Sequence, residues 1–167
     1  RITKTFYWKY PMYKFISFVD LRNRPREEFA EKLREGAITI WVDNDTPFGH
    51  SAVEAIACDN ILIGKVPEMV PEWMIDEDGG LNDCGIWTYD INVIPDLLAN
   101  VVGAWMQDMV PEQLTNAMNE VNAKYTVDKW EENVDGVMST IINEQIKSFE
   151  QIKNSIKQKI TNETKED

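Results

Sequence analysis

Residues 37–64 read AITIWVDNDTPFGHSAVEAIACDNILIG, and this stretch decides the fold. It opens with an apolar, partly β-branched run over residues 37–42, which is typical of a buried strand. A loop leads to a helical stretch over residues 52–57, and a second apolar run over residues 61–63 ends at Gly64. Because both runs are apolar on both faces, the pattern indicates parallel strands covered by helices.

The flanking segments extend this pattern in both directions. Residues 13–21 (YKFISFVDL) predict a further strand, and residues 5–8 also read as strand-like. Pro25 suits a helix start and Gly36 a helix end, so residues 27–35 predict a helix. Residues 76–83 predict a surface loop, residues 85–89 a short edge strand, and residues 94–106 and 111–121 two more helices. We therefore expect an α/β fold, a Rossmann-like three-layer α/β/α domain with a parallel sheet, over residues 1–127.

Residues 128–167 predict a long amphipathic helix followed by a polar tail. Apolar residues recur there at spacings of three and four, namely Met138, Ile142, Ile146, Phe149, Ile152, Ile156 and Ile160. Such a stripe is too regular to remain in water. We expect it to lie across a neighbouring domain or to form a short coiled coil. Within this chain, its own sheet or another copy of the chain would be the partner.

Composition narrows the class of protein. The 167 residues carry a formal net charge of −12, which argues against nucleic acid as a partner. No apolar run approaches the length of a membrane span, so we expect a soluble, cytoplasmic protein. Cys58 and Cys84 lack the spacing of a disulfide framework or of a metal site. The chain starts at Arg1 directly in a strand-like segment, which suggests a piece of a longer protein.

The start of the helix after the first strand is the candidate binding site. Gly49, His50 and Ser51 carry backbone amides that have no partner within the helix, and the helix dipole adds positive potential there. This combination suits a diphosphate. Gly49 allows the backbone to approach such a ligand closely.

Residues 47–58 (PFGHSAVEAIAC), the strand ILIG at 61–64 and the dipeptide Pro67-Glu68 resemble the donor-binding domain of retaining glycosyltransferases of the two-Rossmann (GT-B) type, the glycosyl transferases group 1. The resemblance covers roughly residues 13–121. It implies transfer of a sugar from a nucleotide sugar to an unknown acceptor, with retention, and without a metal or other cofactor. The acceptor domain would precede this chain, so the chain alone would be inactive.

The resemblance also implies a role for individual residues. Glu54 would bind the ribose hydroxyls, and the amides of Gly49 to Ser51 would hold the diphosphate. The acid that touches the donor sugar falls at Thr46, with Asp45 beside it, and Trp73 would line the donor cleft. No catalytic residue is assigned. The implied donor-binding residues are Asp45, Thr46, Phe48, Gly49, His50, Ser51, Glu54 and Trp73.

Some positions depart from the family pattern. Thr46 stands where the family has an acid. The family's basic pair, which neutralises the diphosphate, would lie upstream of this chain. Possible substitutes here are Arg22, Arg24 and Lys65, but each reads better as a surface residue. His50, the only histidine, reads as a neutral bystander near the phosphates. A non-catalytic binding or scaffold module with the same fold therefore stays open. Trp41 and Trp105 are expected in the core.

Overall fold

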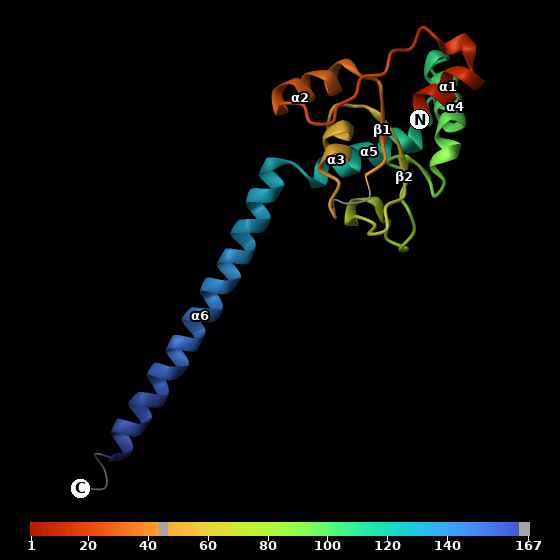
Figure 1. The fold of residues 1–167 in the computed structure, drawn as a ribbon. Coiled ribbons are helices and arrows are strands. Elements are labelled where there is room, and N and C mark those ends of the chain that lie inside the picture. Colours follow the sequence, from red (N-terminus) through yellow and green to blue (C-terminus); the bar gives the residue numbers. More distant parts are fainter. Residues whose placement is uncertain (44–46, 164–167) are drawn as a thin grey trace. The chain divides into compact units, whose positions relative to one another are not determined.

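The computed structural model describes residues 1–43 and 47–163, with side chains as far as residue 154. The chain divides into two units, Arg1–Lys124 and Tyr125–Asp167. The first unit contains a parallel sheet with helices around it (Figure 1). The second unit contains one long helix over the residues that are described.

The sheet of the first unit has three strands in the order β1-β2-β3. These are β1 (Ile38–Trp41), β2 (Ile61–Lys65) and β3 (Ile86–Thr88), and both pairings are parallel. The central strand β2 is buried, whereas most residues of the outer strands are half-buried. All three strands were predicted from their apolar runs, and the structure confirms them.

Four of the helices also agree with the sequence pattern: α2 (Arg26–Glu35), α3 (His50–Ala57), α4 (Ile94–Met106) and α5 (Glu112–Lys124). Helix α3 packs against β1 and β2, α4 packs against β2, and α5 packs against α3. Two short 3-10 helices, η2 (Glu72–Met74) and η3 (Ile91–Val93), lie on either side of β3 in sequence. The predicted α/β class with a parallel sheet is thereby confirmed.

The N-terminal segment contradicts the predicted strands. Residues 5–8 belong to helix α1 (Ile2–Lys9), and residues 13–21 contain no strand after the 3-10 helix η1 (Pro11–Tyr13). The aromatic residues of this segment pack around buried Phe6: Tyr13 stacks on it with ring centroids 5.8 Å apart, and Phe18 meets it edge-on at 5.6 Å. These side chains are therefore used in a local aromatic cluster instead of a sheet.

Helix α4 holds this N-terminal segment in place. Lys9 Nζ lies 2.9 Å from a carboxylate oxygen of Asp96, and the Tyr10 hydroxyl donates to the same carboxylate at 2.7 Å. Hydrogen bonds from Lys9 and then Tyr10 lower the pKa of Asp96. Trp105 was expected in the core and is instead 52% exposed, because the buried stripe of α4 ends at Val102.

The second unit is helix α6 (Val127–Glu163), as its periodicity predicted. Its large apolar side chains are exposed as far as side chains are described. Within residues 1–43 and 47–163, no helix is both long enough and apolar enough to cross a membrane.

Candidate functional site

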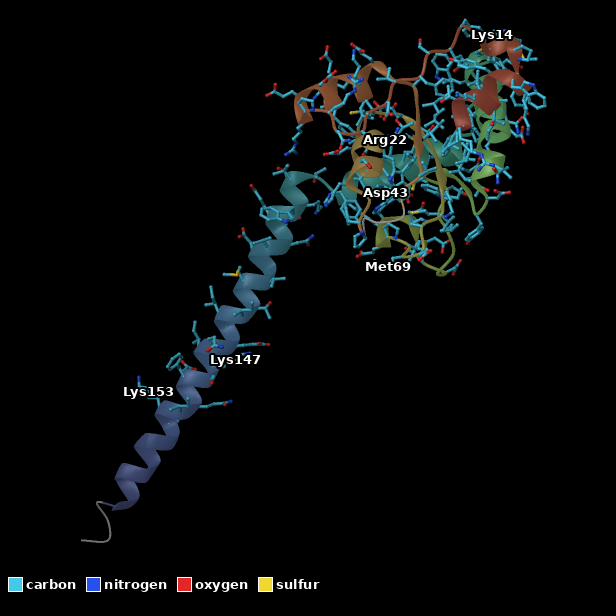
Figure 2. All side chains as sticks on the ribbon, in the orientation of Figure 1. Lys14, Arg22, Asp43, Met69, Lys147 and Lys153 are labelled. Atoms are coloured by element: carbon cyan, nitrogen blue, oxygen red, sulfur yellow. The ribbon has the colours of Figure 1, made fainter. Side chains whose placement is uncertain are left out.

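A surface depression of about 380 Å³ lies between the first turns of α2 and α3. Helix α2 and the residues before it contribute Arg24, Arg26 and Phe29, and α3 contributes His50, Ser51 and Glu54. Asp43, which follows β1 and is labelled in Figure 2, completes the lining. The depression therefore gathers cationic, anionic and hydroxyl groups beside the N-terminus of a helix.

Gly49 sets the geometry at the start of α3. It is the residue before the helix and has φ 70°, in the left-handed region that favours glycine. The backbone there lies directly on Trp41: a Cβ atom at Gly49 would stand 2.7 Å from Cζ2 of that indole. The amides of Ala52 and Val53 both donate to the Gly49 carbonyl, at 2.9 and 3.3 Å. The earlier amides, those of His50 and Ser51, come before the helical hydrogen-bond ladder begins.

Two of three mutually packed indoles contact the start of α3: Trp41 lies against Gly49, and Trp73 bonds to the Phe48 carbonyl. Trp41, Trp73 and Trp87, which we call the tryptophan cluster, have ring centroids 5.9 to 6.4 Å apart. Trp41 and Trp87 flank Gly64 in the strand register, and a Cβ atom at Gly64 would lie 2.7 Å from Cζ3 of Trp87. Glycine in the central strand therefore makes room for the indoles on both sides.

Trp73 was predicted to line an open donor cleft, and the structure places it elsewhere. It is only 2% exposed and is packed within the tryptophan cluster. Its Nε1 donates to the carbonyl oxygen of Phe48 at 2.5 Å, which fixes the loop immediately before Gly49. The indole is therefore a buried support for the start of α3, and it does not line the depression.

The α3 residues of the predicted site do line the depression. Ser51 is half-buried, whereas Glu54 and His50 are exposed. Because His50 and Glu54 are four residues apart, they lie on neighbouring turns of the same helix face. The His50 imidazole lies against the Phe48 ring, with centroids 4.7 Å apart. The structure thus brings His50, Ser51 and Glu54 together, whereas Asp45 and Thr46 lie outside the described residues.

The arginines on and before α2 make different hydrogen bonds and ion pairs. Arg22 lies 2.5 Å from the carboxylate of Asp20. Hydrogen bonds from Arg22 hold the pKa of that carboxyl well below its usual range. Arg24 donates from Nε to the Asp20 carbonyl at 2.7 Å and pairs with Glu28 through Nη1. Arg26 is exposed at the depression. Of the predicted substitutes for the basic pair, only Arg24 lines the site; Arg22 and Lys65 do not.

Sequence reasoning missed Arg26, Phe29 and Asp43. Pro25 signalled that a helix starts near Arg26, but this signal does not place the helix beside α3. Nothing in the linear pattern showed which face of α2 would meet α3.

The two cysteines do not belong to this site. Cys58 is half-buried and Cys84 is buried, and burial raises the pKa of the Cys84 thiol to about 12. Among the described residues, no three side chains of the histidine, cysteine, aspartate or glutamate type are grouped as metal ligands would be.

Comparison of the chain with models of known protein families, with curated proteins and with solved structures gives no match.

Proposed function

We propose that this chain binds a nucleotide sugar in the depression between α2 and α3, and that it supplies the donor-binding half of a retaining glycosyltransferase with a Rossmann-like, three-layer domain. The observation that carries the proposal is the convergence of Arg24 and Arg26 with the first turn of α3. This places two guanidinium groups beside helix amides. Guanidinium forks and helix N-termini are the protein groups best suited to phosphate oxygens.

Each group of the ligand would find its complement in the lining. The diphosphate would accept hydrogen bonds from the amides of His50 and Ser51 and from the guanidinium of Arg26. Glu54, one turn further along α3, would accept hydrogen bonds from the ribose hydroxyls, since an ionised carboxylate is an acceptor only. The same cationic groups would stabilise the negative charge that develops on the diphosphate as the bond to the sugar breaks.

A non-catalytic binding or scaffold module with the same fold is the second candidate. The tryptophan cluster favours it, because Trp73 is buried and offers no exposed ring for a donor sugar to stack upon. Such a module would keep the fold without the donor chemistry, so binding of a nucleoside diphosphate also separates the two candidates. An assay of nucleotide-sugar turnover by the full-length protein separates them.

Calorimetry with UDP and GDP tests the binding step. We expect weak binding of at least one of them, which weakens further as salt is added. Glu54→Ala and Arg26→Ala should each reduce this affinity at least about tenfold, the equivalent of about 1.4 kcal/mol, without changing the melting temperature.

Glu31→Ala is the matched control, because Glu31 is an exposed acid on α2 that does not line the depression. It should bind as the unmodified chain does. Absence of binding to both nucleotides, by this chain and by the full-length protein, would remove the donor-site proposal. A Glu54→Ala variant that unfolds would show instead that Glu54 is structural.

A further inference from the structure

Helix α6 presents an apolar face with no described cover. Its large apolar side chains from Val127 to Ile152 are between 37% and 71% exposed, and with 100° between successive residues they fall within about half of the helix circumference. The opposite face carries polar residues such as Asn143 and Asn154. A stripe of this extent marks an interaction surface.

One line of positions along the apolar face of α6, which we call the seam, is spaced symmetrically about Gln145; it consists of residues 130, 134, 138, 141, 145, 149, 152, 156 and 160. Val137, Ile142 and Ile146 lie beside this seam, and the positions that mirror them hold polar residues. Starting from Gln145, the next residues of the seam stand four and seven positions away on either side: Ile141 and Phe149, then Met138 and Ile152. The sequence continues this symmetry at positions 134 and 156 and at positions 130 and 160. The spacings of four, four and three repeat every 11 residues, a period that keeps one seam facing a partner helix.

Charge is also distributed unevenly along the helix. Residues 127–144 contain five acids and one lysine, whereas residues 145–163 contain four lysines and two acids. Lys147 and Lys153 in the second half are labelled in Figure 2. Two copies lying side by side in opposite directions would therefore set each acidic half against a basic half, and two parallel copies would set like charges together.

We propose that α6 pairs with α6 of a second copy of this chain in an antiparallel arrangement, with Gln145 opposite Gln145. In this register Ile141 faces Phe149 and Met138 faces Ile152, so the apolar residues of the seam meet one another. Gln145 is the only polar residue in the seam between positions 130 and 160, and its amide can hydrogen-bond its counterpart. A single polar residue in an apolar seam fixes register in helix pairs.

The length of α6 suits this arrangement. A helix of 37 residues is about 55 Å long, and Val127 of one copy would lie level with residue 163 of the other. The first units would then be held at opposite ends of the pair. The interface is independent of the nucleotide site, so the two proposals can fail separately.

Sedimentation of the full chain at micromolar concentration tests the pairing. We expect a dimer, and we expect the double variant Ile141→Glu and Ile152→Glu to be monomeric. Asn143→Glu, on the polar face, is the matched control and should remain dimeric. The near-ultraviolet circular dichroism of the tryptophan cluster should be the same in all three proteins, which shows that the first unit is folded.

Disulfide trapping tests the direction, in a Cys58→Ser background with Cys84 left in the core. A mixture of Met138→Cys and Ile152→Cys chains should form a cross-linked heterodimer under mild oxidation. Met138→Cys alone should not, because the two copies of that residue would stand about 21 Å apart, and a disulfide requires Cα atoms within about 7 Å.

Three results would overturn the proposal. Self-cross-linking of Met138→Cys would indicate parallel pairing. A dimer that survives the double glutamate variant would place the interface elsewhere. A monomeric unmodified chain would show that the stripe is not a self-association surface.

Discussion

Gly49 shows how one residue can be required for two separate physical reasons. Its positive φ is a conformation that residues with a Cβ adopt only with strain, and its Cα faces Trp41 so closely that a Cβ would overlap the indole. Both requirements arise at the start of α3, where the proposed site needs the backbone amides at a fixed position. Trp73, through its hydrogen bond to Phe48, holds the preceding residue in place.

Substitution of Gly49 by alanine should therefore destabilise the protein by about 3 kcal/mol, part from the left-handed backbone and part from the contact with Trp41. Chemical denaturation followed by tryptophan fluorescence measures this loss. Gly79→Ala is the matched control, because Gly79 has φ 83° but a Cβ atom added there would meet no other atom within 4 Å. It should cost about 1 kcal/mol. Equal losses in the two variants would mean that the contact with Trp41 contributes nothing.

Asn60 connects three secondary-structure elements. It is a buried polar residue at the entry to β2, and its Nδ2 donates to the carbonyl oxygen of Leu33 in α2 at 2.7 Å and to that of Cys58, just after α3, at 3.2 Å. Its Oδ1 accepts from the Thr39 hydroxyl in β1 at 3.2 Å. The turn before it depends on Asp59, which has φ 59°.

Loss of this side chain should loosen all three connections. Asn60→Ala removes all three side-chain hydrogen bonds and leaves the Leu33 carbonyl with only the Gly36 amide as donor, so we expect a loss of about 3 kcal/mol in the free energy of unfolding. Thr39→Val removes only the hydroxyl bond and should cost about 1 kcal/mol. Urea denaturation measures both. If Asn60→Ala and Thr39→Val lost the same stability, the hydrogen bonds from Asn60 Nδ2 would not contribute to joining α2 and α3 to the sheet.

The whole molecule divides into a unit with a core and a unit without one. Among the described side chains, every buried apolar residue from Phe6 to Val121 lies in the first unit. In α6, the described side chains from Val127 to Asn154 are exposed. The first unit therefore contains what it needs to fold, and α6 contributes an interaction surface.

Truncation after Lys124 tests this division. We expect residues 1–124 to fold alone, with the same near-ultraviolet circular dichroism and nearly the same melting temperature as the full chain, because no buried core residue is removed. The truncated chain should bind UDP or GDP as the full chain does and should be monomeric. Loss of the folded signal would show that α6 stabilises the first unit directly.

The sequence by itself determined the elements whose pattern is strictly local. Apolar runs predicted β1, β2 and β3, and helical periodicity bounded by Pro25 and Gly36 predicted α2. The same reasoning placed His50, Ser51 and Glu54 at the start of α3, where they line one depression. These predictions succeeded because hydrophobic spacing and turn chemistry act over a few neighbouring residues.

Only the tertiary structure decided how these elements use their side chains. The aromatic run at residues 13–21 read as a strand, but it packs around Phe6, because ring contacts with helix α1 bury the same side chains that a sheet would have buried. Trp73 read as a cleft residue but is buried in the tryptophan cluster, and Trp105 read as core but is exposed. Arg26 entered the site only because α2 packs beside α3. Burial and proximity depend on which surfaces meet in three dimensions, and a linear pattern does not specify that.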